Sequence, residues 1–136
     1  MLESASEVIG KIDPSSLSPS IPTFDLNEGE IFLGYYGGPD GRCVRVVLLP
    51  GDADPASWKK QMAWAQSIGG DLPNRIEQAM LFAYLRDEFR REWYWSNQLA
   101  DFDNAYAWFQ SFSYGGQYYY GVTSTLRARA VRREVI

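Results

Sequence analysis

The chain has 136 residues, a formal net charge of −4 at pH 7, one cysteine and no histidine. The shortage of basic side chains argues against generic nucleic-acid binding, which depends on neutralising phosphates. Without histidine, a Ser-His-Asp triad, a Cys-His pair and a zinc site built on His and Cys are excluded. One cysteine cannot form an internal disulfide, so nothing in the sequence requires an oxidising compartment.

A chain of this length fits one domain with a core of its own. No apolar run follows a basic N-terminal segment, so we expect no secretion through a signal peptide. No stretch of about 18 apolar residues occurs either, so we expect no membrane insertion.

The predicted elements begin after a segment rich in serine and proline. Residues 1–25 have little to bury, and we expect them to form a flexible or extended arm ahead of a domain at 26–136. Residues 30–36 and 42–49 are rich in aromatic and β-branched side chains, and the turn-forming sequence 37–41 separates them. This pattern predicts a β-hairpin.

Two helices follow in the predicted order. Asp54, which precedes a proline, is typical of a helix start, and apolar residues then recur at three- and four-residue spacing. This periodicity predicts a helix over 55–68. Asn74, with Glu77 three residues later, resembles a capping box, and the apolar stripe beyond it predicts a second helix over 75–89.

After the second helix the hydrophobic pattern changes to the alternation of β-strands. We expect a short strand at 93–96 and a polar loop at 97–104. Further strands are expected at 106–114 and 117–122, and a last strand at 127–135 carries its arginines on a solvated face. The order of hairpin, helices and then strands predicts an α+β fold with a mainly antiparallel sheet.

Aromatic side chains gather in the stretch 105–124. Because side chains alternate along a strand, we expect one face of 106–114 to be the core face, with Tyr106, Trp108, Gln110, Phe112 and Tyr114. A buried amide on that face must find partners, so either Gln110 brackets a loop or this face is only partly buried. Residues 118–120 are three tyrosines that cannot all point into one core. Their rings either pack over loops or form an exposed binding patch, and the sequence leaves both interpretations open.

Several landmarks occur in a recognisable order. They are Gly69-Gly70-Asp71-Leu72-Pro73-Asn74-Arg75-Ile76-Glu77, Tyr94-Trp95-Ser96, Ala107-Trp108 and Arg127-Ala128-Arg129-Ala130-Val131-Arg132. Over about 44–133 the chain resembles an uncharacterised family encoded by phages and prophages that belongs with the C-type-lectin-like domains. The chain departs from the family pattern at Asn74, where threonine is usual, and at Asn97, where a second serine is expected.

The resemblance implies an α+β, C-type-lectin-like fold in which two helices pack on a small twisted antiparallel sheet with long loops. It also implies that the first and last strands pair. It places Trp58, Leu72, Trp95, Trp108 and Val131 in the structural framework. The disulfides of secreted lectin domains are absent, which suits a protein of the host cytoplasm or the virion.

The resemblance further implies a non-catalytic binding module of phage or prophage origin. Related scaffolds include phage receptor-binding tips and the variable proteins of diversity-generating retroelements, which bind through late strands and loops. The ligand, a protein or a glycan, would then contact Asn97, Asp101, Phe102, Asp103, Asn104, Tyr106, Phe109, Ser111, Tyr118, Tyr119 and Tyr120. A structural protein of a phage particle, homo-oligomeric through the same patch, is an alternative. An intracellular inhibitor of a host defence protein is a third.

The remaining candidate chemistry is sparse. Cys43 lies in a predicted strand, where a buried inert thiol is the expected environment. Asp101, Asp103 and Asn104 carry oxygen donors of the kind that calcium prefers, but the lectin calcium signatures do not occur, and a solvated loop is the simpler interpretation. We therefore expect no cofactor, no metal and no enzymatic activity.

Overall fold

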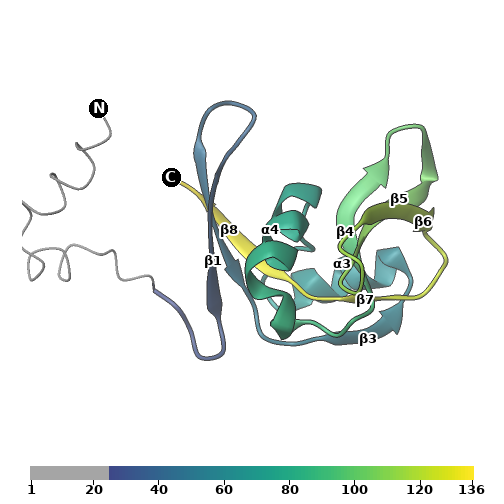
Figure 1. Ribbon diagram of the computed structural model, residues 1–136, viewed down its shortest axis with the longest axis horizontal. Helices are drawn as coiled ribbons and strands as arrows, with labels where there is room; N and C mark the ends of the chain where they lie inside the picture. The colour runs from purple at the N-terminus through teal and green to yellow at the C-terminus, as the bar shows by residue number, and fades with distance from the viewer. Residues whose placement is uncertain (1–24) are drawn as a thin grey trace, which may run out of the picture.

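The computed structural model describes residues 25–136, so the predicted arm lies, except for its last residue, outside the described part of the chain. The described part is an α+β domain (Figure 1). Its helices are α3 (Trp58–Ser67) and α4 (Arg75–Leu85), and a 3₁₀ turn, η1 (Arg86–Glu88), follows α4. Its strands are β1 (Ile31–Gly37), β2 (Cys43–Leu48), β3 (Ala53–Ala56), β4 (Trp93–Ala100), β5 (Asp103–Ser111), β6 (Gln117–Gly121), β7 (Leu126–Ala128) and β8 (Val131–Val135).

The strands form two sheets. One has the order β1-β2-β8, and the other has the order β3-β7-β4-β5-β6. The last strand pairs with β2, where Val47 lies opposite Arg132, and β2 separates it from β1. The expected pairing of the first and last strands is therefore wrong. The β1–β2 hairpin occupies one edge of β2, so only the other edge is left for the returning chain.

The predicted hairpin is confirmed in β1 and β2. Its turn closes through the Gly38 N–H, which donates to the Arg42 carbonyl over 2.6 Å. Gly41 adopts a φ of +81°, a conformation that favours glycine. Cys43 opens β2 beside this turn and is exposed, so its predicted burial is wrong.

The first helix begins later than predicted. Asp54 lies in β3, which pairs with β7, so it does not cap a helix. Ser57 occupies the N-cap position and makes no side-chain capping bond. The start is instead held by Trp58, whose Nε1 donates to the Ser96 carbonyl over 2.8 Å. A tertiary contact therefore replaces the local cap that the sequence suggested.

The second helix begins as predicted. The Asn74 side chain accepts from the Glu77 N–H over 2.8 Å, and the Glu77 carboxylate accepts from the Asn74 N–H over 2.9 Å. This capping box satisfies two donors that a helix start leaves unpaired. The helix ends at Leu85, before the predicted end at residue 89, and continues as η1.

The predicted loop 97–104 is wrong, because β4 and β5 form one hairpin across most of it. Two register shifts interrupt the ladder near Leu99. At these irregularities polar residues turn toward the start of α4: the Asn97 N–H donates to the Pro73 carbonyl, and the Gln98 side chain accepts from the Arg75 N–H. The polar sequence thus reflects bulged strand residues that hold a helix start.

The predicted core face of 106–114 is only partly confirmed, because Gln110 and Phe112 are buried whereas Tyr106 and Tyr114 are exposed. Ala107, Phe109 and Ser111, on the other face, are buried as well. The Gln110 Nε2 donates to the Gly115 carbonyl over 2.8 Å. The amide therefore brackets the turn between β5 and β6, as one of the two sequence interpretations proposed.

Two apolar clusters form the core. The first lies between α4 and the β1-β2-β8 sheet, and the second lies between α3 and the five-stranded sheet. Leu72, Trp95 and Val131 are completely buried, which confirms their predicted framework positions. Trp58 and Trp108 are only half-buried.

The arginines near the C-terminus are paired, so their predicted solvated face is wrong. The single predicted strand is divided between β7 and β8, which belong to different sheets. Arg127 Nε lies 2.9 Å from Asp52 Oδ1, and Arg129 donates to the Leu49 carbonyl over 2.9 Å. Burial, followed by a hydrogen bond to Asp52, raises the pKa of the neighbouring Tyr94 to about 12.

Among these arginines, Arg133 pairs with the most deeply buried carboxylate. Its guanidinium grips both carboxylate oxygens of Glu77, over 2.7 and 2.8 Å, and lies 2.6 Å from Asp71. Glu77 is completely buried and also accepts from the Tyr36 hydroxyl over 2.8 Å. The Glu77 hydrogen bonds raise the pKa of Arg133 above its ordinary value. This cluster connects β8, β1 and the start of α4.

Glu77→Gln isolates the charge of this cluster, because glutamine keeps the shape and the oxygen that accepts from Asn74. We expect the variant to lose about 3 kcal/mol of unfolding free energy, since it leaves the Arg133 charge without its buried partner. Urea unfolding at pH 7 measures the loss. Asp54→Asn is the matched control, because Asp54 pairs with Arg127 on the surface, and it should cost less than about 1 kcal/mol. Equal losses in the two variants would contradict the assignment.

Glu30 should make stability depend on acid. A hydrogen bond from Arg132 holds the pKa of Glu30 at about 2, below the ordinary 4.5. The pKa is lower in the folded chain, so the stabilisation is complete above pH 4.5 and is lost as the pH falls toward 2. We expect the difference in unfolding free energy between the unmodified chain and Glu30→Gln to narrow over this range in urea titrations. A difference that stays constant from pH 6 to pH 2 would refute the assignment.

Candidate functional site

The late strands divide their aromatic side chains between the two faces of one sheet. Residues that lie opposite each other in an antiparallel pair share a face. Tyr119 lies opposite Trp108, whereas Tyr118 lies opposite Phe109. Tyr118, Tyr119 and Tyr120 are 61%, 48% and 46% exposed. The expected exposed tyrosines are therefore present, but they serve two separate surfaces.

The outer aromatic face consists of Phe102, Tyr106, Trp108 and Tyr119. The Tyr119 ring lies at its centre, and its centroid is 4.9 Å from Phe102, 5.8 Å from Tyr106 and 5.5 Å from Trp108. All three contacts are edge-to-face, the geometry that aromatic pairs prefer. Phe102 is 63% exposed at the tip of the β4–β5 hairpin. The four rings therefore form one continuous and accessible surface.

An arginine extends this surface toward α4. The Arg75 guanidinium carbon lies 3.6 Å from the centre of the Trp108 ring, which is a cation–π arrangement. Arg75 Nε donates to Gln117 Oε1 over 3.0 Å, and Gln117 Nε2 donates back to the Arg75 carbonyl over 2.7 Å. The guanidinium is thus fixed in place at the edge of the outer aromatic face.

The inner face of the same strands carries Tyr118 and Tyr120 beside Trp93. Trp93 is 41% exposed, stacks on Phe109 with centroids 4.5 Å apart, and meets Tyr120 edge-to-face at 5.6 Å. An open cavity of about 330 Å³ adjoins it. The lining residues are Pro55, Arg91, Glu92, Trp93, Ser113, Tyr114, Thr125, Leu126 and Arg127.

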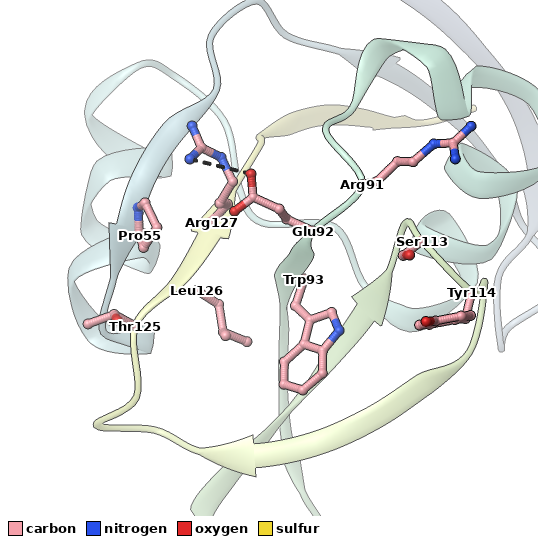
Figure 2. A pocket seen from close by; sticks show the side chains of 9 residues that line it. All are labelled: Pro55, Arg91, Glu92, Trp93, Ser113, Tyr114, Thr125, Leu126 and Arg127. Carbon is pink, nitrogen blue, oxygen red and sulfur yellow. Dashed lines mark ion pairs between the residues drawn. The ribbon is translucent and has the colours of Figure 1, made fainter.

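Figure 2 shows Trp93 and Leu126 pointing into the middle of this cavity, with Arg127 and Glu92 at one end. Arg127 Nη1 lies 3.9 Å from Glu92 and its Nε lies 2.9 Å from Asp52. The cation is therefore neutralised by its own neighbours. The cavity therefore combines ring and aliphatic surface with the charged side chains of Arg91 and Glu92.

Three of the predicted site residues lie in the interior of the domain or beside the start of α4. Phe109 and Ser111 are each only 2% exposed, so their predicted contact with a ligand is wrong. Phe109 faces the core because Ala107 and Phe109 lie on the same side of β5 as the buried Trp95. The Ser111 hydroxyl accepts from the Tyr114 N–H and orders the turn. Asn97 is half-buried and donates to Asp71 beside the start of α4.

The hairpin tip holds the remaining predicted residues. Asp101, Phe102, Asp103 and Asn104 are all exposed, and Asp103 Oδ1 accepts from the Ala105 N–H over 2.9 Å. Within residues 25–136, no three acidic or cysteine side chains lie close enough together to hold a metal ion. Phe102 is the member of this tip that joins the outer aromatic face.

Sequence reasoning missed three contributors to these surfaces. Arg75 reaches the outer face only because α4 packs across β5, which no local pattern records, whereas the alternation of β6 does place Gln117 on the same face as Tyr119. Trp93 and Trp95 lie two residues apart in β4, so alternation does place both side chains on the inner face. This spacing does not distinguish the buried Trp95 from Trp93, which is 41% exposed.

No protein-family model matches this chain, and no curated protein is similar enough to it to count as a relative. In the described part of the chain, no helix is both long enough and apolar enough to span a bilayer.

Single alanine variants should separate surface rings from core rings. We expect Phe109→Ala to lower the unfolding free energy by about 3–5 kcal/mol, because it empties a buried ring position. Tyr119→Ala should cost less than about 1 kcal/mol, because its ring is half exposed and leaves no buried cavity. Urea unfolding measures both values. A large loss in Tyr119→Ala would identify its ring as structural and would remove it from the candidate site.

Proposed function

We propose that this chain is a non-catalytic binding module whose ligand lies across the outer aromatic face. The observation that carries the proposal is the continuous row of ring contacts from the exposed Phe102 and Tyr119 to the half-buried Trp108. Contiguous exposed apolar surface rimmed by polar groups marks interaction sites in soluble domains. The rings are already ordered by one another and by Arg75, so little side-chain entropy is lost on binding.

A protein is the ligand that this surface suits best. Tryptophan, tyrosine and arginine dominate the binding energy of protein interfaces, and all three occur side by side here. The central Tyr119 ring meets its three neighbours at interplanar angles of 74° to 85°, so the face offers ring edges and hydroxyl groups as much as open ring faces. Sugar rings stack most favourably on broad open ring faces. The experiment below must therefore distinguish a protein ligand from a glycan ligand.

We further propose a C-type-lectin-like fold and a phage or prophage origin. The α+β architecture with two helices is compatible with that fold. Support also comes from residues of the family pattern that begin a helix or lie in the core. The Asn74 capping box opens α4, and Trp95 and Val131 are completely buried. In this proposal the outer aromatic face takes the place of the ligand-binding late strands.

The test compares two double variants of the full chain in host-cell extracts. We expect the immobilised chain to capture a protein, which is cross-linked to it and identified by mass spectrometry. Biolayer interferometry then measures the affinity of each variant for that purified protein. We expect Phe102→Ala/Tyr119→Ala to weaken binding by at least about 30-fold, the effect of losing interface hot spots, with little change in melting temperature. Tyr114→Ala, at a ring that is 91% exposed outside this face, should bind normally.

Three other results would redirect the proposal. Unchanged affinity in Phe102→Ala/Tyr119→Ala would reject the outer aromatic face. Loss of affinity in Tyr118→Ala/Tyr120→Ala alone would move the site to the inner face and its cavity. Binding to a glycan array that the outer double variant abolishes, without any captured protein, would replace the protein ligand by a glycan.

A further inference from the structure

The two sheets leave four strand edges, and three of them are protected. An unpaired edge presents a row of backbone donors and acceptors to other chains, so stable proteins usually interrupt it. The edge strand β1 carries a bulge between Phe32 and Gly34. The edge strand β8 carries Arg132, Arg133 and Glu134. The short edge strand β3 contains Pro55, which has no N–H to offer.

The fourth edge, β6, has none of these features. Its sequence, Gln117 to Gly121, has no charge and no proline, and its five pairs with β5 follow one regular register. Within residues 25–136, no strand pairs with its other side. The strand is also rich in tyrosine, a residue of high β-propensity. By the rules that govern the other three edges, β6 is the one that is suited to pairing.

The hydrogen bonds that flank β6 show which backbone groups point outward. The Gly116 carbonyl accepts from Ser111 and the Val122 N–H donates to Ala105, so even-numbered residues pair with β5. Bonding alternates along an antiparallel strand, so Gln117, Tyr119 and Gly121 direct their backbone groups away from β5. The Gly121 carbonyl agrees with this alternation, because it accepts from the Ser124 N–H instead of from β5.

We propose that β6 is a dimerisation edge, at which two copies of this chain pair antiparallel about a two-fold axis through Tyr119. In that arrangement the outward backbone groups of Gln117, Tyr119 and Gly121 are complementary to the same groups of the second copy. Tyr119 exchanges both backbone bonds with the partner's Tyr119, and the Gly121 N–H donates to the carbonyl of the partner's Gln117. Such self-complementarity is the property that a two-fold interface requires. No charged side chain on β6 opposes the approach, although the chain carries a net charge of −4.

The side chains also match across this axis. Tyr119 meets its own counterpart on the outer face, and Tyr118 faces the partner's Tyr120 on the inner face. Cross-strand aromatic pairs stabilise sheets. The five-stranded sheet becomes continuous through both copies, and the two outer aromatic faces join into one longer surface. Pairing through backbone groups leaves both faces open.

The small size of the contact sets its strength. One pair of five-residue strands buries less than the roughly 1,200 Å² at which weak and transient complexes begin. The dimer is therefore reversible and concentration-dependent, with a dissociation constant on the order of 10 µM or weaker. Self-association of this kind is visible by sedimentation at high protein concentration.

A charge-swap experiment on the full chain tests the axis. Tyr119→Lys and Tyr119→Glu each place two like charges against each other, and we expect each variant alone to weaken the dimer at least about tenfold. Mixed in equal amounts, they place lysine opposite glutamate, and the dimer should return. Tyr114→Lys and Tyr114→Glu are the matched controls, because Tyr114 is 91% exposed and lies outside β6. Sedimentation velocity measures the populations, and circular dichroism confirms folding.

None of these measurements involves a ligand. A failure of the dimerisation proposal can therefore be distinguished from a failure of the proposed binding function. Dimerisation of the unmodified chain, its loss in both single variants and its return in the mixture support the β6 axis. An unmodified chain that stays monomeric at millimolar concentration overturns it, as does a folded Tyr119→Lys that dimerises normally. A mixture that stays monomeric also overturns it. Slower amide exchange at Tyr119 and Gly121 on dimerisation, without change at Tyr118, would add support, and its absence in a dimer would count against this register.

Discussion

The arrangement of this domain depends on the ion pair between Arg133 and the buried Glu77. Glu77 is completely buried, and its carboxylate bonds Arg133, Tyr36 and the start of its own helix at once. A buried carboxylate is tolerated only when such partners satisfy it. Since Arg133 belongs to β8 and Tyr36 to β1, the same side chain fixes the first turn of α4 against the three-stranded sheet.

That constraint extends to the candidate site through a short series of contacts. The first residue of α4 is Arg75, whose guanidinium lies over Trp108 of the other sheet. Its partner Gln117 also donates to Gln110, which in turn holds the turn between β5 and β6. The ring surface is therefore preorganised by buried polar groups, which demand specific partners where apolar packing alone would allow several arrangements.

The sequence could predict the elements whose causes are local. The Asn74 capping box and the β1–β2 hairpin each follow from residues close together in the chain. It could not predict which face of β5 is buried, because that choice depends on the side on which α3 and β7 pack against Ala107 and Phe109. The polar residues near Asn97 were interpreted as a loop, since a bulge that serves a distant helix start has no local signature. The sequence also gives no sign of the arginine ion pairs, because the partners of Arg127 and Arg133 are distant in the chain.

Three consecutive tyrosines in β6 gain their meaning from alternation. Tyr119 belongs to the outer aromatic face, whereas Tyr118 and Tyr120 belong to the inner face. The backbone between them supplies the edge, so ring contacts and backbone pairing act in perpendicular directions and do not compete. Tyrosine suits all of these positions, because its ring packs like an apolar side chain while its hydroxyl stays in water. A single five-residue strand can thus contribute to recognition and to assembly at the same time.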